Sequence, residues 1–159
     1  MEYPEKPYIT SLKKSIKSIK VADHIIYITY PIIKEKRLIL KALESTYDAA
    51  VSVLNAILQY EHAWKRISLS QNAHENFQTF VIKCTKNYNI TEQETRELKE
   101  LILTVENHKR SALEFLRKER IIIMEDSLRT HILDAEKVKS YLKTVKVIFQ
   151  KARNVIGLE

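Results

Sequence analysis

One helical pattern between residues 39 and 64 most constrains what this chain can fold into. Mostly apolar side chains recur there at intervals of three and four residues, which keeps them on one face of an α-helix. The stripe consists of Ile39, Leu43, Tyr47, Ala50, Leu54, Ile57, Glu61 and Trp64. No Gly or Pro interrupts the segment between Pro31 and about Arg66. We therefore predict one long helix over this range, with Glu61 at the end of a helical bundle.

The segment from residue 10 to residue 30 predicts an earlier amphipathic helix. Its apolar face is Leu12, Ile16, Ile19, Ile26 and Tyr30, and a second face carries Lys13, Lys17, Lys20 and His24. Because Pro31 has no N–H to donate and fits the first turn of a helix, we end this helix near Tyr30 and begin the long helix there. A kinked helix that continues through Pro31 is the alternative.

Three later helices are predicted from their capping residues. Ser70 is a candidate N-cap for a helix that closes at 87–89. Thr91 and Glu94 have the spacing of a capping box, and the helix that they open ends near His108. Asp134 is the N-cap of the last helix, which Gly157 terminates. Their inward faces are Ala73, Phe77, Phe80, Val81, Cys84 and Tyr88; Leu98, Leu101, Ile102 and Val105; and Val138, Tyr141, Leu142, Val145, Ile148, Phe149 and Ala152.

Length and composition agree with a single helical domain. The chain has 159 residues, of which one is Gly and three are Pro, so it fits one core and few tight turns. We predict an all-α fold, an antiparallel bundle of four to five helices spanning residues 10–156, with residues 1–9 as an N-terminal extension. A long basic connector precedes the last helix.

The connector lies within the stretch "ENHKRSALEFLRKERIIIMEDSLRTHIL", residues 106–133. It is longer than the 2–8 residues usual in helical bundles, and long connectors are often functional. We predict a short helix over "SALEFLRKE" and a short extended piece over "RIIIM", because the latter is rich in β-branched residues.

Positive charge is concentrated at the two ends of the chain. Residues 1–41 hold nine Lys or Arg against four acids, residues 42–108 six against nine, and residues 109–153 twelve against six. Such surfaces meet phosphates, although lysine-rich helix faces also occur as plain solvated surfaces. The residues predicted to bind nucleic acid are Lys109, Arg110, Arg117, Lys118, Arg120, Arg129, Lys139, Lys143 and Lys146. Tyr3, Tyr8, Tyr27 and Trp64 are candidates either for a stacking platform or for the core.

Several kinds of chemistry lack their signatures. A single Gly excludes Walker and dinucleotide phosphate loops, and no paired histidines form a zinc motif. The nearest group, Glu61, His62, His74 and Glu75, matches no known metal loop. We expect no metal, no cofactor and no catalytic residue. Cys84 is predicted to be a buried packing thiol. No apolar run reaches about 18 residues and the N-terminus lacks a signal-peptide pattern, so we expect a soluble, cytoplasmic protein without membrane contact.

The helix pattern resembles the HEPN-like bundles (higher eukaryotes and prokaryotes nucleotide-binding). The likeness is carried by "SLKKSIKSIKVADHII", "LILKALESTYDAAVSVLNAIL", the acidic-capped fourth helix and "KVKSYLKTVKVIFQKARNVI", within residues 10–156. The resemblance implies an antiparallel bundle, often a homodimer, in a family that includes ribonuclease toxins, nucleotidyltransferase partners and non-catalytic members.

The family's ribonucleases carry an Arg followed by a His after four to six intervening residues, and no Arg–His pair here has that spacing. Seven residues separate Arg66 from His74 and one separates Arg129 from His131, while Lys17 and His24 have the spacing with the wrong cation. We therefore predict a non-catalytic bundle that binds RNA or another nucleic acid, or a partner protein, as a homodimer.

Two alternatives remain at the level of sequence. One is a divergent metal-independent ribonuclease that uses His108 or His131 with Arg110, Arg117 or Arg129. The other is a plain oligomeric adaptor.

Overall fold

The computed structural model describes residues 3–110, 113–117, 120–124 and 130–158, with the backbone alone at 110, 113–117, 120–124 and 130–132. Its elements in chain order are α1 (Pro7–His24), η1 (Ile25–Thr29), α2 (Tyr30–Ile33), α3 (Lys36–Ala63), α4 (Ala73–Thr79), η2 (Phe80–Cys84), η3 (Thr85–Tyr88), α5 (Glu92–Arg110), β1 (Leu113–Arg117), β2 (Arg120–Met124), β3 (Thr130–Leu133) and α6 (Ala135–Ile156). The body of the protein is helical, which confirms the predicted class for that part.

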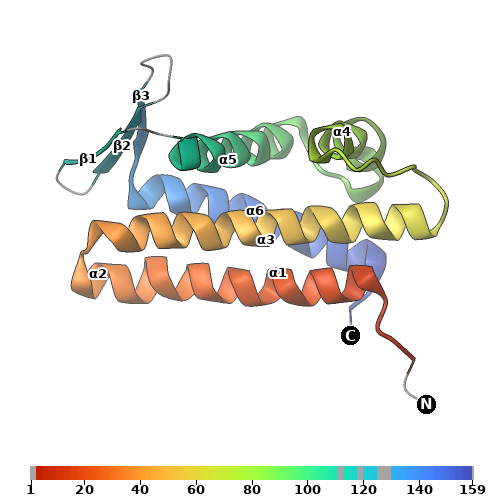
Figure 1. Cartoon of the computed structure of the whole chain (residues 1–159). Helices are drawn as coiled ribbons and strands as arrows, with labels where there is room; N and C mark the ends of the chain where they lie inside the picture. The colour runs from red at the N-terminus through yellow and green to blue at the C-terminus, as the bar shows by residue number, and fades with distance from the viewer. Residues whose placement is uncertain (1–2, 111–112, 118–119, 125–129, 159) are drawn as a thin grey trace.

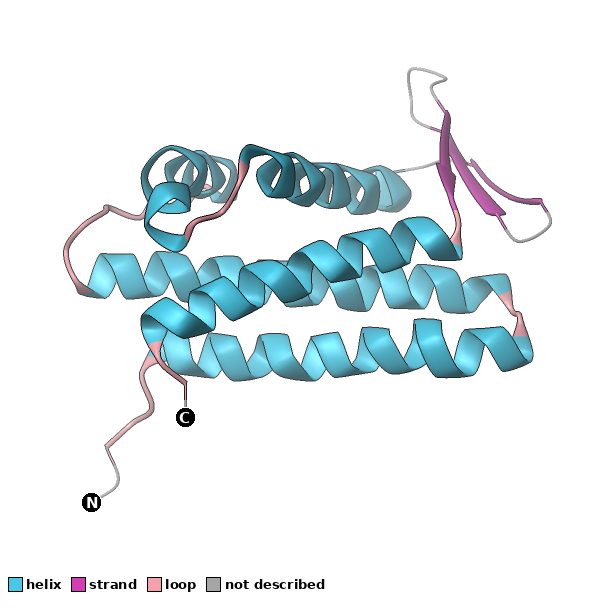
Figure 2. Ribbon diagram, turned by 180° about the vertical axis from the view of Figure 1, so that it is seen from behind, coloured by secondary structure: helices cyan, strands magenta, loops and turns pink. Residues whose placement is uncertain are grey.

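The long helices lie side by side and a small sheet projects from one end (Figure 1). Helices α1 and α3 run in opposite directions, and so do α5 and α6, whereas α3 and α6 run the same way. Seen from behind, α6 crosses α1 and α3 (Figure 2), and it contacts both. The two ends of the described chain lie together, at the end of the bundle away from the sheet.

Helices α1 and α3 meet through small side chains. On α3, Ala42, Ala49 and Ala56 repeat every seven residues, and all three are fully buried. On α1, Ser15 and Ala22 repeat at the same interval and are also fully buried. The Ser15 hydroxyl donates a hydrogen bond to the Ala49 carbonyl oxygen at 2.9 Å. Small residues at such a contact permit the short end of the usual interaxial range, about 8–10 Å. Helix α3 thus buries a second stripe, which was not among the faces predicted from the sequence.

The predicted boundary at Tyr30 is wrong because the helix continues through Pro31, as the alternative expects, but it breaks at Lys34 and Glu35 and so does not join α3. From Pro7 to Ile33 the chain stays helical, and η1 is a π-helical turn in which the Tyr30 N–H donates to the Ile25 carbonyl. A wider turn directly before Pro31 relieves the clash of the proline ring with the preceding turn. The chain then turns at Lys34, a left-handed residue with φ of 56°, and α3 begins at Lys36.

Two of the three predicted N-terminal caps are confirmed. The Glu94 N–H donates to Thr91 Oγ1 at 3.1 Å and the Thr91 N–H to Glu94 Oε1 at 3.5 Å. Asp134 accepts the Lys137 N–H at 2.8 Å. Ser70 is the wrong N-cap for α4: the Asn72 side chain accepts from the first turn instead. The predicted buried faces of α5 and α6 are confirmed, except that Ile102 of α5 is only half-buried.

The connector contains a three-stranded antiparallel sheet in the order β1-β2-β3. The predicted extended piece "RIIIM" is β2, which confirms it, and β2 contacts α5. The predicted helix over "SALEFLRKE" is wrong because Leu113–Arg117 pairs with β2 from Leu113↔Met124 to Arg117↔Arg120. Tertiary pairing here overrides local helix propensity. Helix α5 ends at Arg110, two residues beyond the predicted end.

Helix α3 ends in a Schellman-type cap rather than continuing to Arg66. The Arg66 N–H donates to the Glu61 carbonyl at 3.0 Å and the Lys65 N–H to the His62 carbonyl at 2.9 Å, which is the bonding pattern of that motif. Lys65 occupies its left-handed position with φ of 59°. Trp64 was predicted to lie in the buried stripe, but it is 62% exposed because the helix terminates there.

The replacement Lys65→Gly should raise the free energy of unfolding by about 0.5–1 kcal/mol, because glycine adopts a left-handed conformation without the penalty of a Cβ. Urea denaturation measures the change. Lys41→Gly is the matched control, since Lys41 is exposed inside the same helix, and there the change should cost about 1 kcal/mol. Destabilisation by both replacements would contradict the assignment of this cap.

Candidate nucleic-acid interface

The predicted cations of the connector are only partly described. Lys118 and Arg129 lie outside the described residues, and for Arg110, Arg117 and Arg120 only the backbone is described. Arg117 of β1 and Arg120 of β2 are paired positions in the sheet. Lys109 is exposed at the end of α5, and its Nζ lies 5.2 Å from the ring centroid of Tyr47.

Two of the three predicted cations of α6, Lys139 and Lys146, lie over the ring of Tyr27. The ring of Tyr27, in η1, has Lys139 Nζ 5.2 Å from its centroid and Lys146 Nζ 5.6 Å from it. The ring is 46% exposed. Ammonium groups within about 6 Å of an aromatic ring are attracted by its π-electrons. The two helices that carry most of the positive charge at the chain's ends therefore share one contact surface.

We call this surface the Tyr27 face and define it as Tyr27, Asp23, Lys139, Lys143 and Lys146. Acidic side chains balance part of its charge. Lys146 donates a hydrogen bond to Asp23, and Lys139 pairs with Glu136 at 3.0 Å. Lys143, one turn from each of these lysines on α6, is exposed and makes no ion pair with any described residue. Lys20 is exposed on α1, seven residues before Tyr27.

Other lysines of α6 form ion pairs with acidic residues of α5. Lys137 pairs with Glu100 at 2.9 Å. Lys151 reaches Glu94 at 2.5 and 2.8 Å and also donates to the Asn89 carbonyl at 2.6 Å. The basic residues of α6 thus divide between a structural side toward α5 and the Tyr27 face toward α1. Helical periodicity in the sequence already separates the two sides, because Lys139, Lys143 and Lys146 recur at intervals of four and three residues and Lys137 and Lys151 lie off that face.

A buried carboxylate joins the end of α3 to η3. Glu61 is 2% exposed. It accepts from Arg66 Nε at 2.5 Å, from Arg66 Nη2 at 3.3 Å and from the Tyr88 hydroxyl at 2.9 Å. The ion pair raises the pKa of Arg66 above its usual value, so the guanidinium stays charged. Burial, together with the bond to Glu61, raises the pKa of Tyr88, so its hydroxyl keeps the proton that it donates. Helical periodicity gives no signal for the Glu61–Arg66 pair, because the left-handed residue Lys65 brings these side chains together.

The aromatic residues predicted to form either a stacking platform or part of the core do not lie together in the structure. Tyr8 and Tyr60 pack edge to face with ring centroids 5.2 Å apart, and Trp64 follows 6.3 Å from Tyr60. The Arg66 guanidinium carbon lies over both rings, 5.7 Å from the Tyr60 centroid and 6.0 Å from the Trp64 centroid. Tyr27 lies elsewhere, with the lysines of α6. Tyr3 is 92% exposed.

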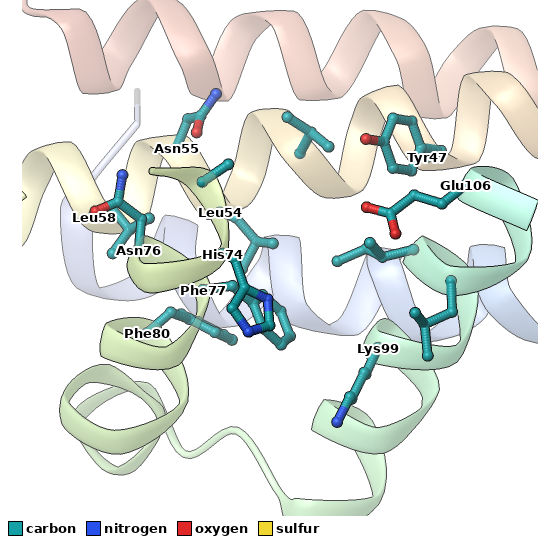
Figure 3. A pocket seen from close by; sticks show the side chains of 14 residues that line it. Tyr47, Leu54, Asn55, Leu58, His74, Asn76, Phe77, Phe80, Lys99 and Glu106 are labelled. Carbon is teal, nitrogen blue, oxygen red and sulfur yellow. The ribbon is translucent and has the colours of Figure 1, made fainter. Parts of the chain in front are cut away.

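An apolar cleft of about 290 Å³ lies between α3, α4 and α5 (Figure 3). Its walls include Leu54, Phe77 and Phe80, while His74, Lys99 and Glu106 bring polar groups from α4 and α5. The volume is at the lower limit of small-molecule sites, and such sites have a few polar groups that converge on the ligand. Among the described residues of this cleft, no hydrogen bond or ion pair links His74, Lys99 and Glu106.

Of the two histidines in the alternative ribonuclease, only His108 has a described side chain. His108 lies 3.7 Å from Glu44 of α3, and the side chain of His131 is not described. His74 Nε2 lies 3.4 Å from the Gln78 amide nitrogen. Within the described ranges, no three His, Cys, Asp or Glu side chains gather as a metal site requires. None of the helices in those ranges has the length and apolar content needed to cross a lipid bilayer.

Comparison with known proteins finds no protein-family model, no curated protein and no solved structure that matches this chain.

Cys84 is buried, as predicted. Burial, helped by the negative charge of Glu61, raises the pKa of its thiol to about 11. The thiol is therefore protonated near neutral pH, and protonated thiols are poor nucleophiles.

At about pH 8, Cys84 of the folded protein should react with a thiol reagent such as DTNB far more slowly than in concentrated guanidinium chloride. Because the folded-state pKa is raised, the thiol's contribution to stability is present below about pH 9 and decreases as the pH rises toward 11. The stability of Cys84→Ala should fall less than that of the wild type over this window. Equal rates of reaction with DTNB in folded and unfolded protein would contradict the assignment of Cys84 as a buried, protonated thiol.

Proposed function

We propose that this chain is a non-catalytic, HEPN-like antiparallel helical bundle that binds the phosphate backbone of RNA or another nucleic acid through the Tyr27 face. The observation that carries the proposal is the position of Tyr27 between Lys139 and Lys146, with Lys143 exposed beside them. The cations of the basic connector are a second part of the proposed binding surface.

The chemistry of the Tyr27 face suits such a ligand. Ammonium groups neutralise phosphates and release condensed counterions, which supplies sequence-independent affinity. A partly exposed tyrosine ring among them offers a surface on which a base stacks. Lys139 and Lys146 pair with exposed or half-exposed acids, and surface pairs of this kind are weak, typically below about 1 kcal/mol. A phosphate can therefore compete with Glu136 and Asp23.

Replacing Lys139 and Lys143 together with Gln should weaken binding of a single-stranded RNA and flatten its salt dependence. The slope of log K against log salt should fall by about 0.7 for each phosphate that no longer meets an ammonium group. Fluorescence anisotropy at several salt concentrations measures both quantities. Lys146 is kept because its replacement would leave Asp23 without its partner.

The control replaces Lys83 and Lys86, exposed lysines of η2 and η3, with Gln. It removes the same charge at a different place and should leave the salt slope nearly unchanged. If both double variants lowered the affinity and the salt slope equally, the binding would depend on net charge alone, and the Tyr27 face would not be the binding site. Wild-type binding that is absent at low salt, or insensitive to salt, would overturn it.

We also propose that the chain associates as a homodimer through the exposed apolar surface of α1, η1 and α2. Val21, Ile28, Ile32 and Ile33 are each at least 50% exposed. Several apolar side chains exposed in one short region are typical of interaction surfaces.

The variant Ile32→Asp should shift the protein toward monomer in sedimentation velocity, because dimer formation would bury a carboxylate in an apolar contact. Ile82→Asp is the matched control, since Ile82 is similarly exposed, at 73%, on η2. A wild type that stays monomeric at high concentration, or a dimer that persists in Ile32→Asp, would contradict this interface.

A further inference from the structure

Trp64 is exposed at the end of α3 and does not belong to the hydrophobic core. The side chain is 62% exposed, although tryptophan is a large apolar residue that folding usually buries. The cap that ends the helix needs only backbone groups of the residues around it. Neither the core nor the cap therefore requires an aromatic ring at this position.

Two neighbours fix the surroundings of the indole. Its contact with Tyr60 is edge to face, with the ring planes at 62°, and Tyr60 is in turn held edge to face by Tyr8 at 87°. The edge-to-face contact with Tyr60 leaves the faces of the indole uncovered by a parallel ring, and the Arg66 guanidinium lies over the indole, 6.0 Å from its centroid. Tyr8, Tyr60 and Trp64 thus pack edge to face in a row and do not stack in parallel.

Arg66 supplies a positioned cation beside the indole. Its Nε and Nη2 donate to Oε2 and Oε1 of the buried Glu61 carboxylate, and the Tyr88 hydroxyl also donates to Oε1. The third guanidinium nitrogen, Nη1, makes no hydrogen bond within the described part of the chain. The Arg66 side chain is 47% exposed. A guanidinium held in this way retains donors for a phosphate oxygen.

We infer that Trp64 and Arg66 form a binding site for an unpaired nucleotide, with its base stacked on the indole and a neighbouring phosphate on Arg66. The inference rests on the proposed nucleic-acid function and narrows the ligand to single strands, because bases inside a duplex have no free face to offer. Trp64 is the C-cap of α3, and Tyr27 belongs to η1, directly before α2. The C-terminal end of α3 and helix α2 lie at opposite ends of the bundle (Figure 1). The site is therefore separate from the Tyr27 face.

Trp64 is the single tryptophan of the chain, so its fluorescence reports on this site alone. The test titrates the full chain with an unlabelled 12-nucleotide oligouridine and, separately, with a blunt RNA duplex of equal length. Anisotropy of a labelled oligouridine measures binding in parallel. We expect the oligouridine to quench Trp64 and the duplex to leave its emission nearly unchanged.

The replacement Trp64→Leu should weaken oligouridine binding by about tenfold, in line with the removal of one base–aromatic stack, while Trp64→Phe should retain most of the affinity. Ile82→Leu is the control for a change at an exposed apolar residue, and circular dichroism checks that each variant is folded. Arg66 is left intact because Glu61 would lose its counter-charge.

The outcomes separate the two proposals. Oligouridine binding that neither quenches Trp64 nor weakens in Trp64→Leu would overturn this site and leave the Tyr27 face standing. Equal quenching by the duplex would overturn the preference for an unpaired base. Absence of binding to either RNA at low salt would overturn the proposed function and, with it, this inference.

Discussion

The close contact between α1 and α3 is the constraint on which the rest of the structure depends. Alanines spaced by seven residues on α3 are fully buried, as are Ser15 and Ala22 of α1, and the Ser15 hydroxyl donates to the Ala49 carbonyl of α3. Larger side chains at these positions would force the helices apart, at a typical cost of about 1–3 kcal/mol. The pair presents two outer surfaces, and α6 crosses both helices on one of them.

This arrangement brings basic residues that are far apart in the sequence onto one surface. Because α6 crosses α1 near η1, Tyr27 comes to lie between Lys139 and Lys146. The side of α6 toward α5 carries the pairs of Lys137 with Glu100 and of Lys151 with Glu94, and the second pair is the more buried of the two. At the end of α3, the buried Glu61 organises Arg66 and Tyr88. Each of the two proposed sites is therefore supported by ion pairs or hydrogen bonds to the bundle.

Elements with strong local signals could be predicted from the sequence, and elements that depend on tertiary contacts could not. The capping box at Thr91 and Glu94 and the buried stripe of α6 follow from short-range rules and are confirmed. The β1 strand was predicted as helix, because its conformation depends on pairing with β2. Tyr27 was recognised only as an aromatic residue, since its lysine neighbours lie more than 100 positions later. Trp64 continued a helical stripe in the sequence, whereas a left-handed Lys65 ends the helix beside it.

The central claim is that nucleic acid contacts the helical faces around Tyr27 and Trp64. Amide and indole chemical shifts of the isotope-labelled protein, followed by NMR during titration with the 12-nucleotide oligouridine, test this claim most directly. We predict that the largest changes fall on η1, on the Lys139–Lys146 part of α6 and on the Trp64 indole. Changes confined to α4, η2 and η3, or to the strands of the connector, would contradict it.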